Sequence, residues 1–270
     1  MRDMRVTLRD AFARLLPNRR RALRRGTLER FPFKDRQLTV YLPPGYSEGD
    51  RRYPVLYMQD GQNLFDDERA FAGHSWRLHL AADEVIGERS AAPMIIVGVD
   101  HAGVGRIEEY TPTHDDKRDA GGQADAYGRM LVDEIKPLID AKYRTTDRAA
   151  IGGSSLGGLV SLYLGLTTGA FAGVGAMSPS IWWDNRAILG VRPLHRPWIW
   201  LDIGGREGAE ALRDARAARD WLRAGGWTAE SLNYYEDRRG DHSEPAWAKR
   251  SRMMLEFLFP PAELHSPHGS

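Results

Sequence analysis

A glycine-rich turn around Ser155 constrains the fold of this chain more than any other feature. The sequence there fits the pattern Gly-x-Ser-x-Gly, with glycines at positions 153 and 157. An apolar run at 149–151 leads into the turn, and a longer apolar run at 159–164 leads out of it. This order is typical of a buried strand, a sharp turn that exposes a serine hydroxyl, and a helix. A plain glycine turn is the alternative, whereas a phosphate-binding loop would need a lysine that is absent here.

Short apolar runs alternate with segments of helical periodicity along the rest of the chain. We expect strands at 37–42, 54–59, 93–99, 147–152, 173–177, 198–203 and 231–235. We expect helices at 127–143, from 156 onward, at 209–224 and at 245–258. Strands regularly separated by helices predict an α/β fold, with an open, mainly parallel sheet covered by helices on both faces. In such sheets the reactive residues gather at the C-terminal ends of the strands.

The composition excludes several kinds of chemistry. The 270 residues include no cysteine, which rules out disulfides, a thiol nucleophile and thiolate metal ligands. The histidine pair at 74 and 79 and the Asp100-His101 pair lack a third ligand at a suitable spacing. We therefore expect no metal and no cofactor. No apolar stretch is long enough for a transmembrane helix.

The first 30 residues are strongly basic. Ten arginines against three acidic residues give this segment a net charge of +7, so the rest of the chain carries about −6. Apolar residues at helical spacing predict a short helix with one apolar face: Leu8, Phe12, Leu15 and Leu16. We expect this face to dock on the main domain. Contact with an anionic membrane or a nucleic acid, or a transit peptide, is the alternative. Because the segment lacks the apolar core of a secretory signal, we expect a cytoplasmic protein.

A nucleophilic serine needs a base to take its proton and an acid to orient the base. Where this kind of turn occurs, the order along the chain is serine, acid, histidine. Four histidines follow Ser155. Of these, His195 precedes an expected strand, and His265 and His268 lie in the terminal tail. His242 lies between the last expected strand and the last helix, where it would reach over the strand ends.

The acid is expected after the strand at 198–203. Glu207, on the glycine-rich loop that follows this strand, is the favoured candidate, and Asp202, near the strand end, is the alternative. An oxyanion would need two backbone N–H donors. We expect them from Leu156, directly after the serine, and from Gln62, in a glycine-containing turn after an earlier strand.

Five sequence blocks carry a resemblance to a known family. They are YPVLYMQDGQNLF (53–65), RIEEYTP (106–112), IGGSSLGG (151–158), MSPSIWW (177–183) and GDHSEPAW (240–247). With these blocks in this order, the chain resembles the putative-esterase family of α/β-hydrolases over roughly residues 26–258. This family includes enterochelin-esterase-like proteins, feruloyl and acetylxylan esterases, esterase D and the mycolyltransferases.

The resemblance implies an α/β-hydrolase fold and a serine carboxylesterase that forms an acyl-enzyme on Ser155. It also implies that His242 is the base and that Glu207 stands at the acid position. Ser154 before the nucleophile and Leu156 after it point toward the enterochelin-esterase-like branch. The implied organisation is a basic extension over 1–30, a catalytic domain over 31–260 and a flexible tail over 261–270.

Three further residues are expected near the substrate. Relatives often carry histidine where this chain has Asp60, which would lie in the pocket, and Trp182 and Trp183 could line an acyl or aryl pocket or pack in the core. The expected partner is a small-molecule ester, of the short-chain, aryl or siderophore type, and not a nucleic acid. An acyltransferase of the same fold and a catalytically idle binding protein are the alternatives.

Overall fold

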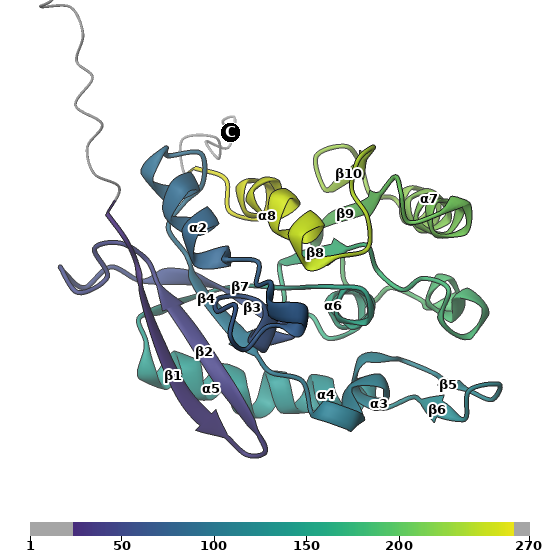
Figure 1. Ribbon diagram of the computed structural model, residues 1–270, viewed down its shortest axis with the longest axis horizontal. Coiled ribbons are helices and arrows are strands. Elements are labelled where there is room, and N and C mark those ends of the chain that lie inside the picture. Colours follow the sequence, from purple (N-terminus) through teal and green to yellow (C-terminus); the bar gives the residue numbers. More distant parts are fainter. Residues whose placement is uncertain (1–23, 262–270) are drawn as a thin grey trace, which may run out of the picture.

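An eight-stranded sheet forms the centre of the protein (Figure 1). The computed structural model describes residues 24–261. The sheet strands are β1 (Thr27–Phe33), β2 (Arg36–Leu42), β3 (Tyr53–Gln59), β4 (Ile95–Val99), β7 (Thr145–Ser154), β8 (Gly173–Met177), β9 (Trp198–Gly204) and β10 (Leu232–Asp237). Their order is β1-β2-β4-β3-β7-β8-β9-β10. β2 runs antiparallel to both of its neighbours, and all other neighbouring strands are parallel.

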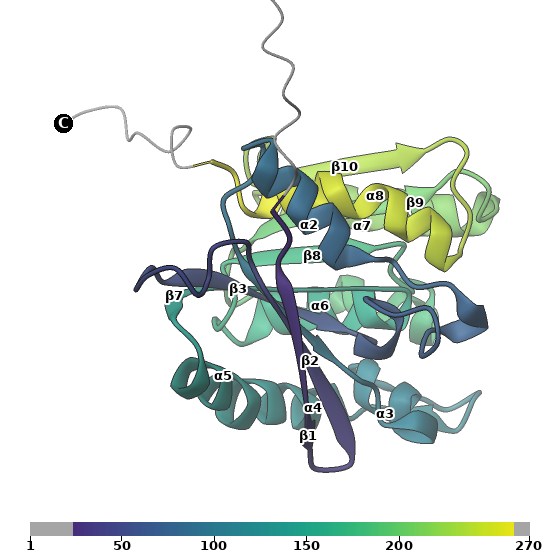
Figure 2. The same ribbon diagram turned by 60° about the vertical axis from the view of Figure 1, so that its left-hand side comes forward.

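Helices cover both faces of this sheet. One face packs against α4 (Ala124–Arg129), α5 (Lys136–Lys142), α6 (Leu156–Thr167) and α7 (Ala209–Ala224). The other face packs against α2 (Leu78–Gly87) and α8 (Glu244–Leu258), which lie side by side in Figure 2. The expected open, mainly parallel sheet between two helical layers is therefore what the chain forms.

The central strands are apolar at nearly every position because each buries both of its faces. In β3, Val55 and Tyr57 belong to the core cluster on one side of the sheet, and Leu56 and Met58 belong to the cluster on the other side. This alternation follows from the two-residue period of a strand. The continuous apolar runs in the sequence therefore indicate strands covered on both sides, as in parallel sheets.

The helix expected over 127–143 contains a π-helical turn. It begins as α4, widens over Met130–Ile135 and continues as α5, whose first turn contains Pro137. Proline has no N–H to donate, and its ring clashes with the carbonyl of the preceding turn. The wider turn just before Pro137 accommodates this ring without ending the helix.

The boundary expected at residue 30 falls inside a strand and is therefore misplaced. β1 pairs with β2 along its whole length, from Thr27 opposite Leu42 to Phe33 opposite Arg36. As the edge strand of the sheet it is largely exposed, so it lacks the apolar run that would reveal it in the sequence. The helix expected around Leu8 to Leu16 lies outside the described residues.

The long segment between β4 and α4 contains secondary structure of its own. It contains α3 (Arg106–Tyr110) and a small hairpin formed by β5 (His114–Asp115) and β6 (Ala120–Gly121). Within residues 24–261, no helix is long and apolar enough to cross a membrane. In the same range, histidine, aspartate and glutamate form no group of three or more that could hold a metal ion.

Candidate active site

Ser155 occupies a strained turn between β7 and α6. Its backbone has φ 56° and ψ −123°, a conformation that residues other than glycine rarely adopt. A Cβ on Gly153 would lie 2.8 Å from the backbone of Gly157, and a Cβ on Gly157 would lie 3.0 Å from the Gln59 side chain. The two glycines therefore let strand, turn and helix pass close to one another. The strand, sharp turn and helix expected from the sequence are all present.

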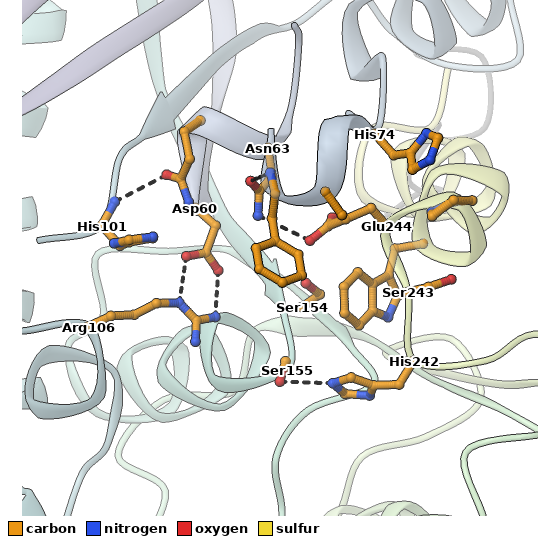
Figure 3. Close-up of a pocket in the computed structure, with 15 residues that line it drawn as sticks. Asp60, Asn63, His74, His101, Arg106, Ser154, Ser155, His242, Ser243 and Glu244 are labelled. Carbon is orange, nitrogen blue, oxygen red and sulfur yellow. Dashed lines mark hydrogen bonds and ion pairs between the residues drawn. The ribbon is translucent and has the colours of Figure 1, made fainter. Parts of the chain in front are cut away.

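The side chains of Ser155, His242 and Glu207 form one hydrogen-bonded series. Ser155 Oγ lies 3.0 Å from His242 Nε2, and His242 Nδ1 lies 2.6 Å from Glu207 Oε2 (Figure 3 shows the first of these contacts). Each residue follows the C-terminal end of a different strand: β7, β9 and β10 for the serine, the glutamate and the histidine. The parallel strands thus deliver to one edge of the sheet three residues that are distant in the sequence.

The Glu207 carboxylate is buried and fully engaged. Its Oε1 accepts hydrogen bonds from Ser178 Oγ at 2.5 Å and from the Gly204 N–H at 2.8 Å. Burial alone would raise the pKa of Glu207, but the hydrogen bonds from His242, Ser178 and Gly204 hold it below its usual value. Glu207 is therefore ionised at neutral pH and can orient His242.

Asp202, the alternative acid, does not contact His242. It is fully buried in β9, accepts hydrogen bonds from the Ser178 N–H and from Trp200 Nε1, and lies 3.1 Å from Arg250 Nη2. The same Arg250 nitrogen donates to Ser178 Oγ at 2.9 Å. Asp202 and Arg250 thus hold Ser178, which in turn holds Glu207.

Ser178 and Arg250 are site residues that the sequence analysis missed. Arg250 is 1% exposed although it is charged. The sequence contains one signal for Arg250. This arginine lies on the apolar face of α8 with Trp247 and Met254, at helical spacings of three and four residues. A single charge on such a face needs a buried partner.

The two residues expected to stabilise an oxyanion lie at the starts of helical turns. Leu156 is the first residue of α6, and Gln62 is the second residue of the short helix η1 (Gly61–Asn63), which follows β3. The first N–H groups of a helix have no acceptor within that helix. β3 is the direct neighbour of β7, so both turns are at the same edge of the sheet as Ser155.

A cavity of about 560 Å³ opens on one side of Ser155, and we call it the first cavity. Its lining includes Gln62, Phe71, Ser155 and His242. Asp60 also lies on its wall, as expected. The Asp60 carboxylate binds the Arg106 guanidinium through two hydrogen bonds of 2.7 and 2.8 Å (Figure 3). The wall therefore carries an ion pair at this point, and the two opposite charges cancel.

Glu244 places a second carboxyl group on the wall of the first cavity, which the sequence analysis did not foresee. It accepts hydrogen bonds from Asn63 Nδ2 at 3.1 Å and from Trp76 Nε1. Burial, together with repulsion from Asp60, raises the pKa of Glu244 to about 7. This group is therefore only partly ionised at neutral pH.

A second cavity, of about 590 Å³, is also lined by His242. Ser180 and Trp182 line it, and Ser180 Oγ lies 3.3 Å from Ser155 Oγ. For Trp183 the structure supports the core-packing alternative and not the pocket, because this residue lines neither cavity and is 3% exposed. It packs in the core and donates a hydrogen bond from Nε1 to the Thr113 carbonyl oxygen.

Comparison with known proteins places this chain in a family. The sequence profile of the family described as Putative esterase matches residues 32–257. The uncharacterized protein YbbA of Bacillus subtilis is 26% identical over 256 residues, which cover 87% of this chain and 97% of that protein.

Two solved structures share the fold. The BES protein of Bacillus cereus has a TM-score of 0.69 and 22% identity, covering 87% of this chain and 95% of that one. The enterobactin esterase FES of Shigella flexneri has a TM-score of 0.68 and 21% identity, covering 86% of this chain and 58% of that one. These likenesses confirm the expected α/β-hydrolase fold. Together with a family profile that spans most of the sequence, they show that this chain belongs to the Putative esterase family, with structural neighbours of the enterochelin-esterase type.

Proposed function

We propose that the protein is a serine esterase that cleaves carboxylic esters through an acyl-enzyme on Ser155. The observation that carries this proposal is the hydrogen-bonded series from Ser155 through His242 to Glu207. Membership of an esterase family makes ester cleavage the reaction that this series would serve. The proposed chemistry uses side chains and backbone groups of the chain alone.

In the first half of the reaction, Ser155 Oγ attacks the ester carbonyl carbon while His242 Nε2 takes the hydroxyl proton. Glu207 accepts the Nδ1–H hydrogen bond, which fixes the tautomer of the ring and stabilises the imidazolium that forms. The negative charge on the carbonyl oxygen would be bound by the N–H groups of Leu156 and Gln62. Each such donor typically lowers the barrier by about 3 kcal/mol.

Departure of the alcohol completes the acyl-enzyme, and attack by water then returns the enzyme to its starting state. His242 Nε2 gives its proton to the departing alcohol oxygen as the bond from carbon to that oxygen breaks, which leaves the acyl group on Ser155. A water molecule then attacks the acyl carbon, and His242 takes one of its protons. Finally the bond to Ser155 Oγ breaks, the serine recovers a proton from His242, and the carboxylic acid is released.

Labelling with a fluorophosphonate and hydrolysis of 4-nitrophenyl esters of increasing acyl length test this proposal. Wild type should be labelled once, on Ser155, and should hydrolyse at least one ester, and Ser155→Ala should lose both properties. Ser161→Ala is the matched control. It removes a hydroxyl from α6, the helix that follows Ser155, where Ser161 Oγ donates to the Gly157 carbonyl oxygen away from His242. Hydrolysis that survives in Ser155→Ala would overturn the proposal, as would a wild type that neither reacts with the probe nor cleaves any ester.

A further inference from the structure

His242 stands between two cavities of similar size. It lines both the first cavity, of about 560 Å³, and the second cavity, of about 590 Å³. Ser155 lines the first cavity, and its hydroxyl partner Ser180 lines the second. An ester bound at Ser155 therefore has space for a substantial group on each side of the scissile bond.

The proposed chemistry decides which half of an ester enters which cavity. The carbonyl oxygen must point toward the oxyanion donors, and Gln62, which carries one of them, lines the first cavity. The alcohol oxygen must lie near His242 Nε2, because that nitrogen supplies its proton. Of the two cavities only the first is lined by Gln62, so it suits the acyl half, and the second cavity, which His242 also lines, suits the alcohol half.

The wall of the second cavity is built around an exposed tryptophan. Trp182 is 42% exposed, a large fraction for such a ring, and the Arg118 guanidinium carbon lies 4.9 Å from the centre of its ring. At this distance the two side chains stack as a cation on an aromatic face. The pair therefore forms a flat surface beside the site, with a positive charge at its margin.

The hairpin that carries Arg118 is anchored next to Trp182. The neighbouring Trp183 donates a hydrogen bond of 2.9 Å to the Thr113 carbonyl oxygen, just before β5. A Cβ on Gly121, at the end of β6, would lie 2.6 Å from the Trp183 ring, so the hairpin and the ring are in close contact. At the hairpin turn, the buried Asp115 accepts a hydrogen bond from Arg118 Nη1. These contacts hold Arg118 over Trp182 in advance of any ligand.

Among the charged side chains on the wall of the second cavity, Arg118 has the most N–H donors without a hydrogen-bond partner. Asp214 is paired with Arg186 at 2.5 Å, and Glu207 is engaged with His242. The Arg118 side chain is 49% exposed, and its contact with Asp115 uses one of the five N–H donors of a guanidinium. Glu210 also lines this cavity, and it is an exposed residue at the start of α7. The N–H donors of Arg118 that its contact with Asp115 does not use can bind an oxygen acceptor on a planar ligand.

We propose that the second cavity is the subsite for the alcohol half of the ester. Trp182 and Arg118 there select an aromatic alcohol that carries an oxygen acceptor such as a carboxylate. This proposal rests on the proposed function of Ser155, since it assigns the two halves of the substrate around that residue.

Three butyrate esters with the same acyl group and alcohols of similar acidity provide the test: ethyl, benzyl and 4-carboxybenzyl butyrate. In wild type, kcat/KM should rise about fivefold from ethyl to benzyl through stacking on Trp182. It should rise about tenfold more for the 4-carboxybenzyl ester through the charged hydrogen bond to Arg118. In Trp182→Ala, benzyl butyrate should no longer be cleaved with a higher kcat/KM than ethyl butyrate. In Arg118→Gln, only the further gain for the 4-carboxybenzyl ester over the benzyl ester should be lost. Each ratio is taken within one variant, so a general loss of folded enzyme cancels.

Arg196→Gln is the matched control for the arginine substitution. Arg196 also stacks on a tryptophan, with its guanidinium carbon 5.6 Å from the Trp227 ring, but it lines neither cavity. This variant should keep both ratios. Ratios that stay unchanged in both test variants would overturn the subsite proposal. If ethyl butyrate is cleaved and Ser155 reacts with a fluorophosphonate, such a result leaves the proposed function standing. If neither occurs, the proposed function itself fails.

Discussion

Glu207 Oε2 lies 2.6 Å from His242 Nδ1, whereas Asp202, five residues earlier in the chain, faces Arg250 in the interior. The two carboxylates thus have separate partners although both are close to the end of β9. The difference arises because Asp202 is still a residue of the strand, while Glu207 follows the glycine turn that leaves the sheet. Substitutions at the two positions should therefore fail in different ways.

Glu207→Gln should lower kcat strongly and stability little. The amide can still donate or accept near His242, but it no longer stabilises an imidazolium or enforces the required tautomer. We expect kcat on a 4-nitrophenyl ester to fall on the order of 10⁴-fold, as for the equivalent change in other serine hydrolases. Steady-state kinetics together with a thermal melt check this prediction. A variant that retains more than a tenth of wild-type kcat would show that Glu207 does not orient His242.

Asp202→Asn should mainly lower stability. The neutral side chain leaves the Arg250 charge buried without its closest carboxylate partner, which typically costs about 3 kcal/mol or more. Urea unfolding should show a lower midpoint with an unchanged slope. The folded fraction should keep a larger share of kcat than Glu207→Gln does. The opposite ranking in kcat would transfer the role of the acid to Asp202.

The pattern around Ser155 could be predicted because local sequence determines it. The glycines at 153 and 157 are required by close backbone approaches within the turn itself, and the parallel strands then bring Glu207 and His242 to the same edge. The bond between Arg250 and Ser178 could not be predicted in this way. It depends on how α8 packs against the end of β8, a tertiary contact between residues far apart in the chain.

The missed strand β1 and the buried Glu244 illustrate two other limits. β1 is an exposed edge strand, so its pairing with β2 leaves no hydrophobic pattern in the sequence. Glu244 reads as an ordinary acidic residue in the first turn of a helix. Its environment is set by Asn63 and Trp76, two residues on the segment after β3 that donate hydrogen bonds to its carboxylate.

Truncation of the N-terminus should separate a dispensable segment from an essential one. Deletion of residues 1–23 leaves intact the Arg24–Glu48 ion pair, the hydrogen bond from the Gly26 N–H to Asp83, and all of β1. This variant should keep the kcat/KM of the full chain, because every described residue of the site and of the sheet is retained. Deletion of residues 1–30 removes four of the seven residues of β1 and exposes the edge of β2. It should lower the melting temperature and increase aggregation. Equal melting temperatures for the two truncated proteins would show that β1 does not stabilise the sheet.

Glu244 should make stability depend on pH. Because burial raises the pKa of Glu244 to about 7, the folded protein keeps a proton that the unfolded chain releases near pH 4.5. The resulting stabilisation is fully present below about pH 4.5 and is lost as the pH rises to about 7. Glu244→Gln is uncharged throughout and lacks this loss. Its free energy of unfolding should therefore improve relative to wild type between pH 4.5 and pH 8, by up to about 3 kcal/mol.

Urea unfolding of both proteins at several pH values measures this difference. Glu84→Gln, on the exposed side of α2, is the control for the general effect of removing one carboxylate. In Glu244→Gln the side-chain amide has a single oxygen. It can therefore accept a hydrogen bond from Asn63 or from Trp76, but not from both. This lost contact lowers the stability of the variant equally at every pH, so the change of the difference with pH isolates the charge. A difference that is constant from pH 4.5 to pH 8 would mean that folding does not raise the pKa of Glu244.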